Sequence, residues 1–197
     1  MKLRPTLVVL TVLLPAVLVL VINLGVKAAD NSLVASVEKK IEHIQQNATL
    51  EHPDEKPTEF TEQEINVYIA SGRVKLPQGV QSVRFTGEPD LVTGNARVDF
   101  DELKAGRSSS NPLLSVFSGV HDVVVVAHAR GMNHQGHVQV ESVSLDGVEI
   151  PRFALQLFIE KYLQPKYPNI GMTSQFALPA KIDTAIVGQH KLTVSQK

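Results

Sequence analysis

Three histidines lie close together in the sequence and are the first groups to consider for chemistry. His128, His134 and His137 are spaced by six and three residues, so a strand pair turning near His134 could bring two imidazoles together. Imidazole nitrogen is a common ligand for zinc and related metals. No carboxylate stands among them at a spacing that would complete such a site. We therefore expect no metal and interpret them as titratable groups on a polar sheet face, with a metal-dependent hydrolase using His128 and His137 as the weaker alternative.

Like the histidines, the acidic residues and the serines give no indication of a catalytic site. Asp99 and Asp101 would share one face of a strand beside Glu102, which is typical of a solvated edge and not of a calcium loop. No G-x-S-x-G nucleophile motif and no phosphate-binding glycine loop is present. Arg107, beside three serines, stays open as a contact for a phosphate head group. The sequence predicts a protein that is not an enzyme and needs no cofactor.

What the sequence offers in place of catalytic groups is apolar surface. A helix opened by Pro151 has apolar residues at i, i+3, i+4, i+7 and i+8, and its apolar arc is wider than one contact face needs. A run of four valines in a strand and a short segment after Pro112 add to this surface. Together they predict either an ordinary core or a groove between helix and sheet that admits an acyl chain. The expected groove residues are Leu155, Phe158, Ile159, Tyr162, Val124, Val126, Leu114 and Phe117.

An uncharged apolar run, Thr6–Val26, stands near the N-terminus. It is close to the ~20 residues that a helix needs to cross the hydrocarbon layer. Val26-Lys27-Ala28 also fits the small-residue rule for signal-peptide cleavage before Ala29. Segment 1–28 is therefore expected to be a cleaved signal peptide or a membrane anchor, with the anchor favoured. Lys2 and Arg4 keep the N-terminus in the cytoplasm in both cases, so the rest of the chain is expected to be extracytoplasmic.

The composition narrows the class further. The chain has 197 residues, a formal net charge of −1 and no cysteine. Segment 1–28 has three basic residues and no acid, so the remainder carries 16 basic residues against 20 acidic ones. A net negative domain has no basic face for nucleic acid, which excludes that partner. Without disulfides the domain depends on its core, and we expect a bacterial envelope location, in the periplasm or on the outer face of the inner membrane.

The apolar pattern divides the rest of the chain into two parts. Residues 29–59 are predicted to form a stalk helix laid against the domain by an apolar stripe (Val34, Val37, Ile41 and Ile44), followed by a Pro-rich linker. Residues 60–197 are predicted to form one domain. Thr61 and Glu64 make a capping box, and from Val74 the apolar period changes from 3.6 to 2. The fold class is α+β, with an antiparallel sheet covered on one face by helices.

Short motifs in this domain suggest a family resemblance. They are Phe60-Thr61-Glu62-Gln63-Glu64-Ile65-Asn66, Leu76-Pro77, Leu145-Asp146-Gly147-Val148-Glu149-Ile150-Pro151 and Leu178-Pro179-Ala180-Lys181-Ile182-Asp183. With these the chain resembles, over roughly residues 60–195, small membrane-anchored extracytoplasmic domains of the YpmS-like group and other TULIP (tubular lipid-binding) relatives. The resemblance implies a curved antiparallel sheet wrapped around a helix, with an apolar groove for lipid. The helices expected here are short for lining a long tube, and no ligand residue can be carried over.

Two functions are therefore expected. The favoured one is a non-catalytic envelope protein that binds or passes a lipid or another apolar molecule. The alternative is a membrane-tethered structural domain that contacts a protein partner, or a second copy of itself, through the Val34–Ile44 stripe and a sheet edge.

Overall fold

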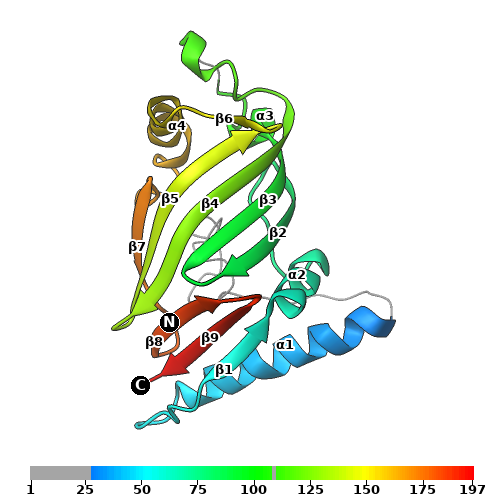
Figure 1. Ribbon diagram of the computed structural model, residues 1–197, viewed down its shortest axis with the longest axis vertical. Coiled ribbons are helices and arrows are strands. Elements are labelled where there is room, and N and C mark those ends of the chain that lie inside the picture. The colour runs from blue at the N-terminus through cyan, green and yellow to red at the C-terminus, as the bar shows by residue number, and fades with distance from the viewer. Residues whose placement is uncertain (1–27, 108–109) are drawn as a thin grey trace.

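The computed structural model describes residues 28–107 and 110–197. It has one antiparallel sheet of nine strands and four α-helices, which confirms the expected α+β class (Figure 1). No helix in the described ranges is both long enough and apolar enough to span a membrane. The predicted leader, Thr6–Val26, lies outside the described residues.

The strands and helices follow one another along the chain in a simple order. The strands are β1 (Thr58–Thr61), β2 (Val80–Glu88), β3 (Leu91–Asp99), β4 (Val120–Met132), β5 (Gln135–Leu145), β6 (Val148–Glu149), β7 (Thr173–Ala177), β8 (Ile182–Gly188) and β9 (Lys191–Gln196). The helices are α1 (Ala28–Asn47), α2 (Glu62–Ala70), α3 (Phe100–Leu103) and α4 (Arg152–Phe158), with a 3₁₀ turn η3 (Pro112–Leu114) and a π-helical turn η4 (Ile159–Leu163).

The sheet is built on β4, its longest strand. Along one edge β4 pairs with β5, and along the other it pairs first with β3 and then, at Arg130 and Gly131, with β8. Two groups of strands, β3–β2 and β8–β9–β1, therefore share one edge of β4, and Figure 1 shows the second group below the first. A Cβ atom at Gly131 would lie 2.8 Å from Cβ of Ala185, so glycine is what lets β8 approach so closely.

Two clusters of buried side chains make up the core. The lower core lies between α1, α2 and the β8–β9–β1 group, and the upper core lies between α4, η3 and the long strands. Side chains from the inward face of the sheet contribute to both. The lower core includes Val34, Val37, Ile44, Phe60, Tyr68, Ile69, Phe85, Ile182, Leu192 and Val194. The upper core includes Val98, Phe100, Leu114, Phe117, Val123, Leu145, Leu155, Phe158, Ile159 and Tyr162.

Helix α1 is packed into the lower core. Val34, Val37 and Ile44 are each at most 6% exposed. At the end of the helix, Asn47 is buried and its Nδ2 donates to Oε1 of Gln196, 2.8 Å away on β9. The Gln196 amide in turn donates to the carbonyl of Ile44. The stripe thus packs against the rest of the domain, in line with a stalk helix laid against it and not with a stripe left free for a second copy.

The capping box at the start of α2 is confirmed. The backbone N–H of Glu64 donates to Oγ1 of Thr61 and the Glu64 carboxylate accepts from the backbone N–H of Thr61. The same carboxylate, 6% exposed, accepts from Nζ of Lys40 at 2.6 Å and from Oγ of Ser36 at 2.6 Å. Burial alone would raise the pKa of Glu64, but the hydrogen bonds from Lys40, Ser36 and Thr61 outweigh it and hold the pKa below its usual value. This carboxylate therefore joins α1 to α2.

The amide of Asn66 links α2 to the sheet. Its Nδ2 donates to the carbonyl of Phe85 and its Oδ1 accepts from the Phe85 backbone N–H, both at 2.7 Å. Both backbone groups of a strand residue are satisfied by one side chain, as expected for a partly buried amide beside the inward face of a helix.

Candidate functional site

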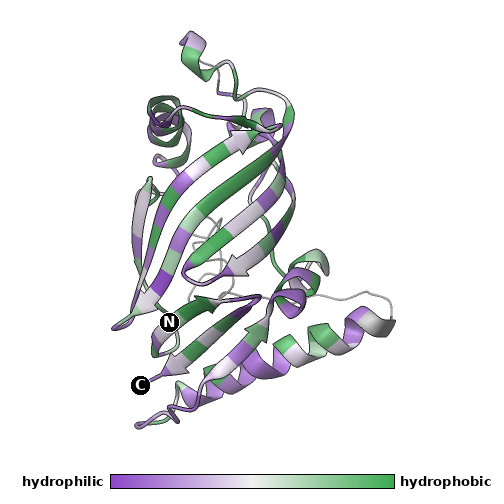
Figure 2. Cartoon of the chain, viewed as in Figure 1, coloured by the Kyte–Doolittle hydropathy of each residue, from purple (hydrophilic) through white to green (hydrophobic). Residues whose placement is uncertain are grey.

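An apolar cavity of about 150 Å³ lies in the upper core between the sheet and α4, and we call it the upper cavity. Its lining comes from β2–β5, β7, α3, α4 and η4 and from two loops, and among the lining residues that the structure describes Ser174 alone has a polar side chain. Figure 2 shows the apolar run of β4 beside strands that alternate in hydropathy. Lining side chains include Val83, Ala96, Val123, Val125, Val140, Val143, Leu155, Phe158 and Ile159.

Four of the predicted groove residues line this cavity. They are Phe117, within residues 111–119 before β4, and Leu155, Phe158 and Ile159, on α4 and η4. The other two residues from these elements, Leu114 and Tyr162, are buried in the same upper core, behind the lining, and are 5% and 2% exposed.

The structure places Val124 and Val126, which were also expected in the groove, outside the cavity lining. Their neighbours across the strands are Asn95 and Ser144 for Val124, and Thr93 and Ser142 for Val126, so they lie on the outer, polar face. Successive side chains of a strand alternate between faces, and the valines that line the cavity are Val123 and Val125.

An aromatic cluster closes the cavity at the end next to residues 111–119. The rings of Phe117 and Phe158 are stacked with centroids 4.2 Å apart, and Phe100 meets Phe158 edge-on at 5.5 Å. Such pairs add to the free energy of burial. Phe117 is 1% exposed although it belongs to a short irregular segment. The aromatic contacts thus hold the segment against α4.

The helix over the cavity changes its winding at Ile159. The backbone N–H of Gln164 donates to the carbonyl of Ile159, which is the five-residue spacing of a π-turn. Nη2 of Arg107 donates to the carbonyl of Tyr162 at 3.1 Å, and the guanidinium carbon lies 5.8 Å from the Tyr162 ring centroid. Arg107 therefore satisfies a carbonyl near the helix end and covers the aromatic ring of the same residue. π-turns are rare and recur at functional sites.

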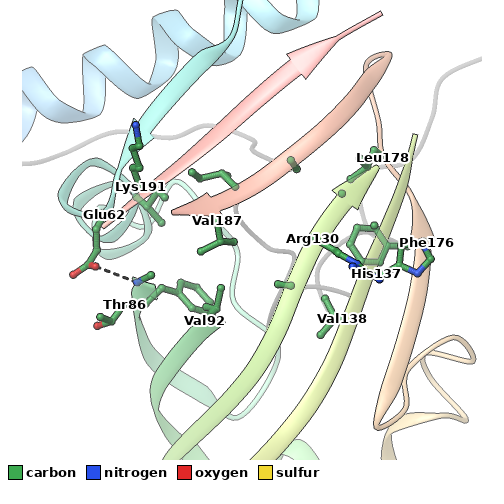
Figure 3. A pocket seen from close by; sticks show the side chains of 18 residues that line it. Glu62, Thr86, Val92, Arg130, His137, Val138, Phe176, Leu178, Val187 and Lys191 are labelled. Carbon is green, nitrogen blue, oxygen red and sulfur yellow. Dashed lines mark hydrogen bonds between the residues drawn. The ribbon is translucent and has the colours of Figure 1, made fainter. Parts of the chain in front are cut away.

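A second apolar space, the lower cavity, has a volume of about 90 Å³. Phe85, Val92, Phe176, Leu178, Val187 and Leu192 are among the residues that line it. Figure 3 shows Glu62 and Lys191 at one end of it and Phe176 at the other. Val138 lines both cavities, so its side chain on the inward face of β5 stands between the two apolar spaces.

Two charged side chains that line the lower cavity, Glu62 and Lys191, are paired with residues outside its lining. Glu62 accepts from the backbone N–H of Gly87 at 3.1 Å, and its Oε2 lies 2.7 Å from Nδ1 of His190. Nζ of Lys191 lies 2.8 Å from Oε1 of Glu59, and this hydrogen bond lowers the pKa of Glu59. The sequence does not indicate this cavity, because its walls come from strands spread along the chain from β2 to β9.

The three histidines considered for a metal site have separate partners. Nε2 of His128 lies 3.5 Å from Glu141, and Nε2 of His134 lies 3.7 Å from Asp183. His137 is the cross-strand neighbour of Arg130, a cation. Within residues 28–107 and 110–197 no group of three His, Cys, Asp or Glu side chains is placed to hold a metal ion.

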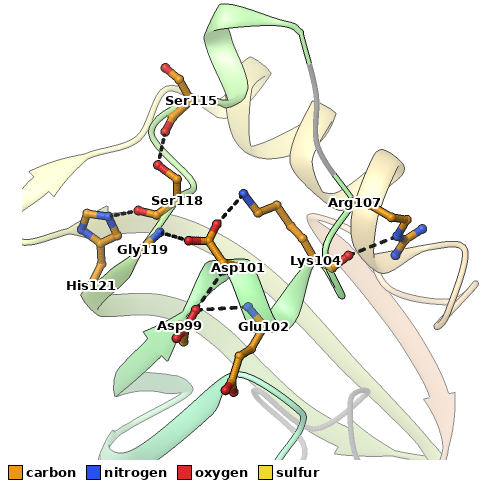
Figure 4. A network of polar contacts seen from close by, with 9 residues as sticks. All are labelled: Asp99, Asp101, Glu102, Lys104, Arg107, Ser115, Ser118, Gly119 and His121. Carbon is orange, nitrogen blue, oxygen red and sulfur yellow. Dashed lines mark hydrogen bonds and ion pairs between the residues drawn. The ribbon is translucent and has the colours of Figure 1, made fainter.

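A polar network lies at the end of the upper cavity (Figure 4). Asp99 caps α3 by accepting from the backbone N–H groups of Asp101 and Glu102, so the predicted strand has ended at this point. Oδ2 of Asp101 accepts from the backbone N–H of Gly119, and Oδ1 lies 3.0 Å from Nζ of Lys104. The hydrogen bonds from Lys104 and Gly119 lower the pKa of Asp101.

Both ring nitrogens of His121, at this end of the molecule, have hydrogen-bond partners. Its Nδ1 lies 2.6 Å from Oδ2 of Asp146 and its Nε2 lies 2.7 Å from the carbonyl oxygen of Ser118. The Asp146 carboxylate and the Ser118 carbonyl raise the pKa of His121, and the hydrogen bond from His121 lowers the pKa of Asp146. A Ser–His–Asp triad would need Nε2 to face a serine hydroxyl. Here it faces a carbonyl oxygen, and Oγ of Ser118 donates to Ser115.

Comparisons with known proteins add no name to this geometry. No family model matches the chain, and no curated protein and no solved structure matches it.

Proposed function

We propose that the chain is a non-catalytic envelope protein, exported or anchored through segment 1–28, whose domain binds or passes a lipid or another apolar molecule. The observation that carries the proposal is the upper cavity of about 150 Å³, which is lined almost wholly by apolar side chains. An empty apolar space in a core costs stability, so a protein that keeps one gains from filling it with a ligand.

The volumes limit what can bind without rearrangement. An engineered cavity of about 150 Å³ with a similar lining takes up benzene, whereas drug-sized ligands occupy about 300–1,000 Å³. The upper cavity alone therefore fits one ring or a few methylene groups. A full acyl chain has to continue past Val138 into the lower cavity or displace part of α4.

The resemblance to YpmS-like and TULIP proteins is part of this proposal. A curved antiparallel sheet, seen in Figure 1, is one of the features that the resemblance implies, and buried residues of α1, α2 and α4 pack with inward-facing strand residues. The alternative, a tethered domain that contacts a protein partner, loses its first candidate surface because Val34, Val37 and Ile44 are buried. A sheet edge remains available for it.

The test is native mass spectrometry of the full chain purified from membranes, with solvent extraction of any bound molecule. We expect a bound lipid or other apolar species. Val125→Phe should remove it, because Val125 lines the upper cavity and a phenyl ring fills the space. Val126→Phe is the matched control, since Val126 is equally half-buried on the same strand but lies on the outer face.

The control should keep the bound species. A ligand-free mass for the unaltered protein, together with no uptake of a dansyl-labelled fatty acid, would overturn the proposal. Equal loss in both variants would place the ligand outside the upper cavity.

A further inference from the structure

The segment Asn111–Gly119, which we call the cap segment, closes one end of the upper cavity. It alternates between solvent and core: Leu113 and Val116 are exposed, while Leu114 and Phe117 are buried. Only Phe117 among these lines the cavity, where it stacks on Phe158. Whatever loosens the cap segment therefore opens an apolar wall of the cavity to water.

The cap segment is held at its end by three hydrogen bonds. Gly119 donates its N–H to Asp101 and accepts from the backbone N–H of Phe100. One residue earlier, the carbonyl oxygen of Ser118 lies 2.7 Å from Nε2 of His121. Gly119 has a φ of +77°, a left-handed value that glycine tolerates and that makes it a natural hinge. The Ser118 carbonyl and the Gly119 N–H belong to one peptide group on the segment side of this hinge, so His121 and Asp101 hold that group from its two ends.

The geometry around His121 requires both ring nitrogens to be donors. Nδ1 faces a carboxylate oxygen of Asp146 and Nε2 faces a backbone carbonyl, and neither group can donate. Neutral imidazole has one N–H, so it can make only one of the two bonds. Only the imidazolium makes both. Loss of one proton must break the link to Asp146 or the link to Ser118.

The charges around His121 decide which link survives. Asp146, in the turn before β6, is anionic and also accepts from the backbone N–H of Asp122 on β4. Arg97 on β3 is paired with Asp122 at 2.8 Å. On α3, Asp101 is paired with Lys104, and the Phe100 ring centroid lies 6.0 Å from that of His121. The remaining N–H stays with the carboxylate, because a charge-assisted bond is the stronger one.

We propose that His121 is a pH-dependent latch on the cap segment: the imidazolium holds Ser118 and keeps the cavity end closed, and the neutral imidazole leaves the Ser118–Gly119 peptide group to Asp101 alone, so that the segment opens more readily about Gly119. The link between opening and ligand release rests on the proposed function. The latch itself does not, because it concerns the cap segment with or without a ligand.

Hydrogen exchange of the ligand-free full chain tests the latch. The amides of Leu114, Ser115 and Phe117 are hydrogen-bonded within the cap segment. After correction for the intrinsic pH dependence of exchange, their protection should fall roughly tenfold between about pH 5 and about pH 9, the scale set by one charged hydrogen bond. The midpoint should coincide with the titration of the His121 ring followed by NMR.

Two variants make the result specific. His121→Gln should abolish the pH dependence of protection in the cap segment, because an amide does not titrate. His128→Gln is the control, since His128 lies on the same strand beside a carboxylate but on the outer face, and it should leave the transition unchanged. The latch is refuted if protection does not change with pH in the unaltered protein, or if the transition persists in His121→Gln.

The outcomes separate the two proposals. A pH transition in a protein that never binds an apolar molecule leaves the latch standing and removes the proposed function. A lipid-binding protein whose cap segment shows no pH transition keeps the proposed function and refutes the latch. If His121→Gln fails to fold, the coincidence of the ring titration with the exchange midpoint in the unaltered protein still decides the matter.

Discussion

The ring of Phe117 lies flat against the ring of Phe158, with centroids 4.2 Å apart and ring planes 28° apart. The two residues come from a short irregular segment and from α4. Their contact joins the cap segment to the helix that covers the upper cavity. With the buried side chain of Leu114 it holds this segment, whereas Leu113 and Val116 on the same segment face solvent.

Phe117→Ala should lower the free energy of unfolding by about 3 kcal/mol, the usual cost of deleting a buried aromatic ring. Leu113→Ala is the control on the same segment and should change it by less than about 0.5 kcal/mol, because Leu113 is 46% exposed. Urea unfolding measures both. Similar small losses in the two variants would mean that the cap segment is not packed against α4.

Lys40→Met should lower the free energy of unfolding by about 3 kcal/mol, because it leaves the buried carboxylate of Glu64 without its cation. Arg97→Met, which breaks the exposed pair with Asp122, should have a much smaller effect, because solvent screens that pair. Adding Glu64→Gln to Lys40→Met should recover part of the loss, because the amide carries no charge. No recovery would show that Lys40 acts through packing.

Tyr68→Phe should raise the free energy of unfolding by about 1 kcal/mol. The Tyr68 hydroxyl is buried and has no hydrogen-bond partner among the described residues, so removing it removes a desolvation cost. Burial also raises the pKa of Tyr68 to about 12, and an ultraviolet pH titration should lose that late ionisation in the variant. A loss of stability would instead reveal a partner for the hydroxyl, such as an ordered water molecule.

Stability should be greatest in a pH window bounded by Glu64 and His121. The pKa of Glu64 is lowered on folding, so its stabilisation is present above its ordinary pKa and is lost as pH falls through the lowered value. The pKa of His121 is raised, so its stabilisation is present below its ordinary pKa and is lost as pH rises through the raised value. Urea midpoints measured across pH should fall on both sides. His121→Gln should flatten the alkaline side and leave the acid side intact.

The local features of the fold were predictable because their causes are local. The capping box of Thr61 and Glu64 follows from a four-residue motif, and the apolar face of α4 follows from helical spacing. The short turn after Pro112 follows from a proline at its first position, with Asn111 as its cap. The hydrogen-bonding role of the Asn66 amide follows from its position beside the inward face of α2.

The side of the sheet on which each valine of β4 lies was not predictable. Four valines in a row have no alternation, so Val124 and Val125 look alike until the partners of the strand are known. The polar neighbours Asn95 and Ser144 identify the outer face. A bulge between Val126 and Ala127 in the pairing with β5 further obscures the pattern, because the inward residues of β5 change from Val143 to Val140 across it.

The lower cavity and the place of α1 depend on contacts between distant parts of the chain. Phe85 and Leu192 line the same space, and Val34 packs in the same core as Val194. An apolar stripe on a helix shows that something covers it but not what does. The stripe of α1 was therefore compatible with a stalk, a dimer or a core, and only the strand order decides among them.

The pairing of the first strand with the last has a consequence for how the protein is made. β1 pairs with β9, and Asn47 bonds to Gln196 across 149 residues of sequence. Helix α1 meets α2 soon after both have been made, but its contacts with Val194 and Gln196 wait for β9. Contacts so distant in sequence form late, since the chain must first close long loops. The lower core therefore stays incomplete in the nascent polypeptide until β9 has been made.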